Sequence, residues 1–466
     1  MRRVITKLKI TGLFDRFDYL INIDQKDSRL AILTAPNGYG KSTILKIIKS
    51  FADGDYHYFV RENFLRIEIS FSEGSEVVIT SFVENGKKQV LINYENKTTI
   101  VSDPFEDGSA SDQAFLFERA LPFLTRIGSG TWRHDRSGER LDRAEVIARY
   151  GSHPSIRRRI NRVEWLEEIR SSLSVFSIPT HRLRAEDDER IERGDGGTEL
   201  MVNNIANRVR DSIAKAIRNQ FDIGRKQETS FPTRLISSLR AKVTPSQDSI
   251  VELIVSIQHY ERRYARLGLL PDSTVTRQIA DVPDVAESAA LLVLKTYLDD
   301  VREKFLLLDD MASRLDIFCR SINQLLAFKL IRTSIGNGIE VFPKIQGPVK
   351  PKPIPLSALS SGEQHLIVLI GKLIFEVDAN TLVLLDEPEI SFHPEWQEKF
   401  LTILEDVRKI NNFSALIATH SSILIGDRWN QVIELAEQGG IDTYTDDADD
   451  FFAEQIGLPF AEGHRV

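Results

Sequence analysis

A phosphate-binding loop is the first stretch of the chain whose residues could do chemistry. Residues 35–43 read Ala-Pro-Asn-Gly-Tyr-Gly-Lys-Ser-Thr, between an apolar run at 30–34 and a helical pattern at 43–51. This order lets backbone N–H groups and a helix N-terminus converge on phosphate oxygens, although Ala35 stands where a glycine is usual. Lys41 is expected to neutralise the β- and γ-phosphates, and Ser42 to hold Mg²⁺. The predicted nucleotide-binding residues are Asn37, Gly38, Tyr39, Gly40, Lys41, Ser42 and Thr43.

A second candidate lies far along the chain, at residues 359–364, Leu-Ser-Ser-Gly-Glu-Gln, just before a helical pattern at 365–376. Ser360 is expected to cap this helix and Glu363 to complete a capping box, which leaves first-turn amides facing an anion. A well-capped helix without a ligand is the alternative. The predicted binding residues are Ser360, Ser361, Gly362 and Glu363.

Two acids follow an apolar run at 382–385, which predicts a buried strand of parallel type. Asp386 could hold Mg²⁺ through water, and Glu387 could polarise the water that attacks a γ-phosphate. The turn that follows could place Ser391 or His393 against a second subunit.

A histidine ends the next apolar run, residues 413–420. His420 could hydrogen-bond the γ-phosphate and orient the attacking water. The alternative is a structural histidine at a strand end.

Composition bounds the class of protein. The chain has 466 residues, 42% of them hydrophobic and 27% charged, and a net charge of −8. That charge argues against a uniformly basic nucleic-acid coat but leaves room for a local basic patch. The single cysteine, Cys319, excludes an internal disulfide and suits a cytoplasmic location. No apolar run approaches the roughly 20 residues of a membrane span.

The elements that must position these residues can be read from periodicity. Alternation at 4–10 and 18–24 predicts two strands, and three further runs predict a small antiparallel meander with a turn at Asn85-Gly86. These three runs are 64–71, 76–83 and 88–94.

Residues 185–325 have a helical pattern, with an apolar stripe that recurs every four residues and turn-rich breaks at 222–234 and 268–284. An antiparallel helical arm and a plain helical lid are both compatible with it. Strands resume at 327–333 and 338–344. The predicted fold is therefore an α/β head interrupted by a helical insert. Its expected parts are 1–184 and 326–430 for the head, 185–325 for the insert and 431–466 for a tail.

Charge is unevenly distributed. The stretch 126–184 is rich in arginine and densest at Arg157-Arg158-Arg159, which could be a phosphate-backbone or partner surface, although interleaved acids favour a solvated helix face. Arg182, at the end of a predicted strand, is a further site candidate, and a surface ion pair is the alternative. The acidic, aromatic segment 446–452 could dock a basic partner or simply fray.

The motif order resembles the ABC-type ATPases. Residues 359–364 stand where these ATPases have their signature motif, and they are called the signature below. The long interval between the phosphate loop and this signature is similar to that in the SMC and RecF branch and unlike that in transporter subunits. The run 386–397, Asp-Glu-Pro-Glu-Ile-Ser-Phe-His-Pro-Glu-Trp-Gln, and Ala-Thr-His-Ser-Ser at 418–422 look like the bacterial AAA-family ATPases of phage-defence systems. These include the ATPases of the Septu and PARIS systems and of the overcoming-lysogenization-defect nucleases.

The resemblance implies an ATP- and Mg²⁺-dependent ATPase whose heads pair, each site using one chain's phosphate loop and the other chain's signature. Lys41 and Ser42 would bind phosphate and metal, Asp386 and Glu387 would be the metal-binding and catalytic acids, and His420 would be the switch. Only residues 421–466 follow that histidine, too few for a nuclease fold, so any nuclease is expected to be a separate partner. The alternative is a DNA-repair or chromosome clamp that binds duplex DNA itself.

Overall fold

The strand predicted before the phosphate loop is present as β3 (Leu30–Thr34), and helix α1 (Lys41–Asp53) follows the loop. The computed structural model describes residues 3–23, 29–102, 115, 117–128, 130–135, 138–150, 163–180, 200–240, 245–270, 288–344 and 351–438. Contacts divide the chain into two compact units. The first comprises residues 3–172 and the segment beginning at Gln431, and the second comprises residues 173–430.

The first unit contains an antiparallel sheet of six strands. In its edge strand, Phe17, Tyr19 and Ile21 are buried and the residues between them are exposed, as alternation requires when one face meets a core. The predicted turn forms because Asn85 and Gly86 both have positive φ, which the tight hairpin turn needs. In sheet order the strands are β2 (Phe17–Asn22), β1 (Ile5–Leu13), β4 (Arg66–Phe71), β5 (Glu76–Glu84), β6 (Lys87–Tyr94) and β7 (Lys97–Val101).

The remaining elements of the first unit are short. Strand β16 (Val432–Glu434) pairs in parallel with β3, and α16 (Leu435–Gln438) follows it. A second antiparallel sheet has three strands. Its strands are β8 (Leu124–Arg126), β9 (Thr131–His134) and β10 (Arg140–Asp142), and α5 (Arg143–Tyr150) contacts β9 and β10. Helices α2 (His57–Arg61) and α7 (Glu164–Ser172) contact α1.

The second unit is built on a parallel arrangement of β11 (Val175–Ile178), β14 (Leu382–Asp386) and β15 (Ser414–Thr419). Strands β14 and β15 are buried along nearly their whole length, which explains their unbroken apolar sequence. The helices of this part are α13 (Ser361–Phe375), α14 (Pro394–Asn411) and α15 (Ser422–Ile425), with a short 3-10 turn at Leu356–Ala358.

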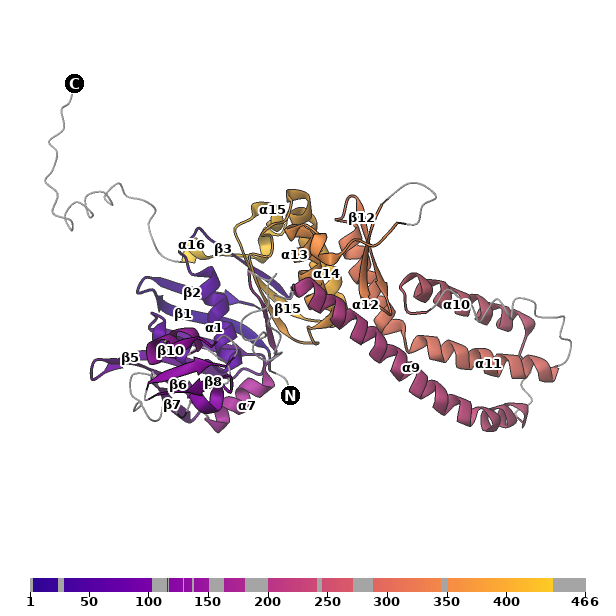
Figure 1. The fold of residues 1–466 in the computed structure, drawn as a ribbon, viewed down its shortest axis with the longest axis horizontal. Helices are drawn as coiled ribbons and strands as arrows, with labels where there is room; N and C mark the ends of the chain where they lie inside the picture. Colours follow the sequence, from indigo (N-terminus) through magenta and orange to yellow (C-terminus); the bar gives the residue numbers. More distant parts are fainter. Residues whose placement is uncertain are drawn as a thin grey trace, which may run out of the picture. The chain divides into compact units, whose positions relative to one another are not determined.

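The helical insert belongs to the second unit. Helix α9 runs from beside α13 to the far end of the insert, where α11 packs along it and α10 packs on α11 (Figure 1). The predicted strands after the insert form an antiparallel hairpin. The elements are α9 (Met201–Arg240), α10 (Gln247–Arg266), α11 (Ser288–Leu306), α12 (Asp309–Asn323), β12 (Lys329–Ser334) and β13 (Gly338–Pro343).

Two close approaches fix α9 near its start. Gly338 has φ +70°, and a Cβ there would collide with the carbonyl oxygen of Ala206, so only glycine lets the hairpin turn meet the backbone of α9. A Cβ on Gly371 of α13 would collide with Cγ2 of Ile205. The first turns of α9 are therefore held between α13 and the hairpin.

The break expected at 222–234 is wrong, because α9 continues through it with Pro232 inside the helix. The amide of Gln220 donates to the carbonyl oxygen of Lys304, and Arg234 forms an ion pair with Asp300. These contacts to α11 hold the helix on both sides of Pro232, which lacks the N–H of a regular helix residue.

The predicted α/β class, the antiparallel meander and the helical insert are confirmed by these elements. Parallel and antiparallel strand pairs both occur. The clusters at Arg157-Arg158-Arg159, Arg182 and 446–452 lie outside the described residues.

Candidate functional site

The phosphate loop in the first unit has the backbone that phosphate binding needs. Gly38 and Gly40 have φ of +89° and +81°, and α1 begins directly after them at Lys41. Lys41 is buried, and its Nζ donates to the carbonyl oxygens of Ala35 and Pro36 at 2.8 and 3.1 Å. The ammonium group therefore lies over the loop, where a phosphate would meet it.

The walls of the loop come from its neighbours in the same unit. A Cβ on Gly40 would lie 3.0 Å from Cδ2 of Leu13, so glycine also avoids a steric conflict there. The Tyr19 hydroxyl donates to the carbonyl oxygen of Tyr39 at 2.8 Å. Burial, with a smaller effect of the Tyr39 hydroxyl, raises the pKa of Tyr19, which keeps this donor protonated. Ala35 is buried and lacks a positive φ, so the position does not need the usual glycine.

The capping box predicted at the signature is present in the second unit. The Ser360 Oγ accepts from the Glu363 N–H at 3.3 Å, and the Glu363 carboxylate accepts from the Ser360 N–H at 2.8 Å. Lys329, on β12, adds an ion pair to the Glu363 carboxylate at 2.7 Å. Burial opposes ionisation of Glu363, but the bonds from Lys329 and Ser360 outweigh it and hold its pKa below the usual range.

At Gly362 the signature packs closely against the turn that follows Asp386 and Glu387. A Cβ at this position would lie 2.6 Å from the carbonyl oxygen of Ser391, so the close approach requires glycine. Ser391 has φ +69°, and His393 caps α14 by accepting from the Glu395 N–H at 3.4 Å. Ser361 is the first helical residue of α13 and is exposed.

The acidic residues and the histidine come together at the ends of β14 and β15. Asp386 ends β14, and its carbonyl oxygen accepts from the Thr180 hydroxyl at 3.3 Å. Glu387 has φ +47°, a left-handed conformation that is rare for a residue with a side chain. Its Oε1 lies 3.8 Å from Nε2 of His420, and both side chains are about one-third exposed (30% and 35%). This pair can accept or deliver a proton at an accessible surface.

The donor chemistry fits a magnesium nucleotide. Mg²⁺ prefers oxygen ligands and usually binds through one or two protein groups together with substrate phosphates. The Ser42 hydroxyl of the first unit and the Asp386 carboxylate of the second unit are each an oxygen ligand of this kind. In the described ranges, no group of three or more His, Cys, Asp or Glu residues could hold a metal ion.

Sequence reasoning missed two residues in the second unit. Glu389, in the turn, bonds to Thr419 and to the His420 N–H, and Lys329 holds Glu363. Glu389 stands in the run 386–397 already singled out for its acids, but its partner Thr419 lies 30 residues further along the chain, so the sequence alone predicts no role for it. For Lys329 the sequence has no signal, because its partner lies on another element.

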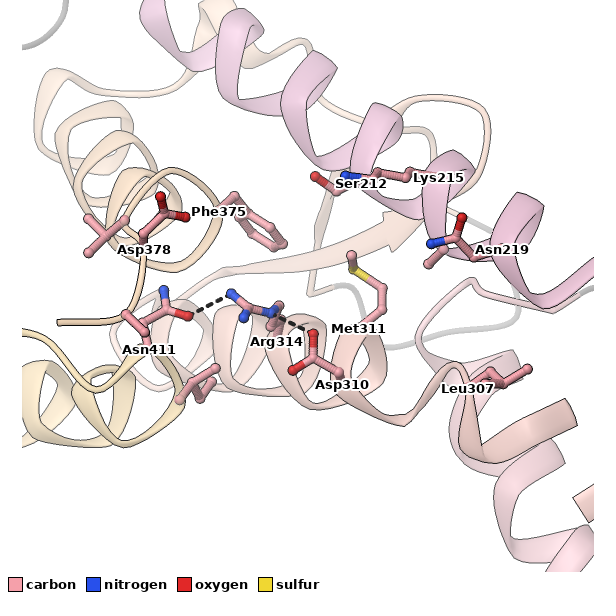
Figure 2. A pocket seen from close by; sticks show the side chains of 14 residues that line it. Ser212, Lys215, Asn219, Leu307, Asp310, Met311, Arg314, Phe375, Asp378 and Asn411 are labelled. Carbon is pink, nitrogen blue, oxygen red and sulfur yellow. Dashed lines mark hydrogen bonds and ion pairs between the residues drawn. The ribbon is translucent and has the colours of Figure 1, made fainter. Parts of the chain in front are cut away.

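A pocket of about 430 Å³ lies elsewhere in the second unit, among α9, α12 and the C-terminal ends of α13 and α14. Arg314 extends across it between Asp310 and Asn411, and α9 presents Ser212, Lys215 and Asn219 opposite (Figure 2). The Arg314 guanidinium also donates to the carbonyl oxygen of Ile374 at 2.9 Å, where a cation stabilises the end of α13. None of the predicted site residues lines this pocket.

Comparison with known proteins covers part of the chain. Residues 347–426 match the family model described as "AAA domain, putative AbiEii toxin, Type IV TA system". A stretch of 70 residues is 39% identical to protein ea59 of Escherichia phage lambda; it makes up 15% of this chain and 13% of that protein.

Solved structures with low similarity include two SMC heads. The Smc head domain of Pyrococcus furiosus, with an extended coiled coil and bound to the C-terminal domain of ScpA, is 12% identical, with 98% of this chain and 100% of that chain covered and a TM-score of 0.35. The SMC head domain from Thermotoga maritima is 13% identical, with 91% of each chain covered and a TM-score of 0.32. TM-scores this low support no inference about this chain.

Among the helices that the structure describes, none combines the length and apolar character needed to cross a membrane. The glycine-rich loop between β3 and α1 and the match of residues 347–426 to an AAA domain both support a P-loop ATPase.

Proposed function

We propose that this chain binds and hydrolyses ATP as an ABC-type ATPase subunit of an anti-phage defence complex. In this role it acts in the cytoplasm as a sensor and scaffold, and ATP-dependent pairing of two heads controls a separate nuclease. The observation that carries the ATPase assignment is the Glu387–His420 pair, with 3.8 Å between Oε1 and Nε2 at the end of two buried strands.

Each residue has a role in this proposal. Lys41 and the loop amides bind the β- and γ-phosphates of ATP, and Ser42 and Asp386 hold Mg²⁺. Glu387 polarises the attacking water, and His420 contacts the γ-phosphate and orients that water. Mg²⁺ supplies charge neutralisation at the phosphates.

The signature completes the site of a second copy. Ser360 and Gly362 stand at the N-terminus of α13, where first-turn amides favour an anion. The geometry that supports this role is the capping box, which orients the turn before any ligand arrives. Closure of the pair then depends on a γ-phosphate, so nucleotide state can be transmitted to a partner.

The place in phage defence rests on the resemblance of the motifs. The description of the matched family names a putative toxin of a toxin–antitoxin system, and the matched relative is a phage protein, which supports a role in conflict between phage and host. Helix α9 of the insert packs on α13, and Lys329 of the hairpin pairs with Glu363 of α13, so a partner bound to the insert could alter the signature.

Purification with the products of the flanking genes tests this function. A tag on this chain, with mass measurement in the presence and absence of ATP and Mg²⁺, should recover a stable complex containing a second protein with a nuclease fold. A chain that pairs only with ATP and binds duplex DNA in a salt-sensitive manner would instead favour the DNA-repair or chromosome clamp. Absence of ATP hydrolysis under both conditions would contradict the ATPase assignment.

A further inference from the structure

Glu389 bridges two segments that the sequence separates by 30 residues. It lies in the turn between β14 and α14 and is 9% exposed. Its Oε1 accepts from the Thr419 hydroxyl at 2.5 Å and from the His420 N–H at 3.2 Å. One carboxylate oxygen therefore holds the turn that carries Glu387 and the strand end that carries His420.

The bridge belongs to a longer chain of bonds. Thr419 is fully buried, and its hydroxyl oxygen accepts from the Ser421 N–H at 2.9 Å. The Ser421 hydroxyl bonds to Gln397 of α14 at 2.6 Å. Loss of Glu389 would therefore leave Thr419 without its acceptor in the middle of this chain.

Backbone strain surrounds Glu389. Glu387 has φ +47° and Ser391 has φ +69°, two residues to either side. Such conformations persist at non-glycine residues only where surrounding contacts determine them, and they gather at functional sites. The contacts of Glu389, with the bond from the Glu387 N–H to the carbonyl oxygen of Ala418 at 2.9 Å, are of that kind.

The second carboxylate oxygen of Glu389, Oε2, makes no stabilising contact with the described residues. This atom is buried and lacks a hydrogen-bond partner among them. A buried polar atom without a partner is destabilising, so stability alone does not explain the side chain at this position.

We propose that Glu389 is a positioning residue for ATP hydrolysis, which fixes the His420 backbone and the Glu387 turn so that imidazole and carboxylate stay paired. The inference rests on the proposed ATPase function. Glu389 acts through these two residues. A residue with a purely structural role would change the stability of the protein but leave the turnover of the folded fraction unchanged.

Four variants test the bridge. Glu389→Ala and Thr419→Val remove one side each, whereas Glu389→Gln keeps an acceptor oxygen and Thr419→Ser keeps the hydroxyl. Because misplacement of a catalytic group by about 1 Å can cost about 100-fold in rate, the first two should lower kcat by about that factor with an unchanged KM for ATP. Glu389→Gln and Thr419→Ser should stay close to the unmodified protein.

Amide hydrogen exchange supplies a readout that needs no activity. A peptide spanning 415–424 should exchange faster at the His420 amide in Glu389→Ala than in Glu389→Gln, because only the latter retains the acceptor. Circular dichroism and thermal unfolding identify the folded fraction. Should Glu389→Ala not fold, the Thr419→Val and Thr419→Ser pair makes the same comparison.

Two results would overturn the inference: kcat of both disrupting variants equal to that of the unmodified protein, or Glu389→Gln as slow as Glu389→Ala. A chain that hydrolyses no ATP even without substitution would refute the proposed function instead. In that case hydrogen exchange at the His420 amide alone tests the Glu389 bridge. Equal exchange rates in Glu389→Ala and in the unmodified chain would show that the bridge does not hold the His420 backbone.

Discussion

Lys329 Nζ lies 2.8 and 2.7 Å from the two carboxylate oxygens of Glu363, so the hairpin after the insert holds the first turn of the signature helix. The side chains are 27% and 13% exposed, which makes the pair less screened than a surface ion pair. The capping box of α13 is thus supported by a cation from another element.

Replacement of this cation should loosen the signature. Lys329→Met leaves Glu363 with its capping bonds but without its charged partner, and we expect a loss of about 1–2 kcal/mol in the free energy of unfolding, measured in urea. Lys352→Met is the matched control, because Lys352 is exposed on the following segment. An equal loss in both variants would show that the ion pair contributes nothing specific.

The Lys329–Glu363 interaction should also make the stability of the protein depend on pH. The pKa of Glu363 is lower in the folded chain than in the unfolded chain, despite burial, because of Lys329 and Ser360. Its stabilising contribution is therefore complete above the unfolded pKa of about 4.3 and disappears as pH falls through the folded value. Urea midpoints between pH 7 and pH 3 should fall more steeply in the unmodified chain than in Glu363→Gln; parallel curves would contradict the shift.

The crossing of α9 and α13 at Ile205 and Gly371 should resist added volume. Gly371→Ala is expected to destabilise by about 1–2 kcal/mol, because the new methyl group collides with a stiff β-branched side chain. In an Ile205→Ala background the same change should cost less, as contacting sites couple. Gly224→Ala is the control: its Cβ would meet only the flexible end of Lys304, so thermal unfolding should show no loss.

The acid at 387 should separate ATP binding from hydrolysis. Glu387→Gln keeps the shape of the side chain but cannot polarise water as a carboxylate does, so it should bind ATP and retain it with little turnover. Lys41→Ala should abolish nucleotide binding, which filter binding with labelled ATP would detect. Turnover by Glu387→Gln equal to that of the unmodified chain would remove Glu387 from the catalytic role.

Local signals in the sequence predicted much of this fold. The apolar run before the phosphate loop coincides with β3, and Ser360 and Glu363 form the capping box because both partners lie within one turn. The helix boundary at 222–234 was not predictable in the same way, since contacts with α11 carry α9 past Pro232.

The site was partly predictable for the same reason. Asp386, Glu387 and His420 follow buried strands, and the parallel pairing of β14 with β15 brings these strand ends together. Glu389 was missed because its role depends on Thr419, and that contact exists only once the two strands have paired. Lys329 depends in the same way on the packing of the hairpin.

The left-handed backbone at Glu387 creates a conflict between catalytic turnover and thermal stability. Glycine and asparagine adopt φ near +47° more readily than glutamate, so Glu387→Gly or Glu387→Asn would relieve strain while deleting the proposed catalytic acid. Under the proposed mechanism, a library screened only for thermal stability would therefore enrich chains that cannot hydrolyse ATP. Engineering of a more thermostable variant should therefore keep Glu387 and place stabilising substitutions at other positions.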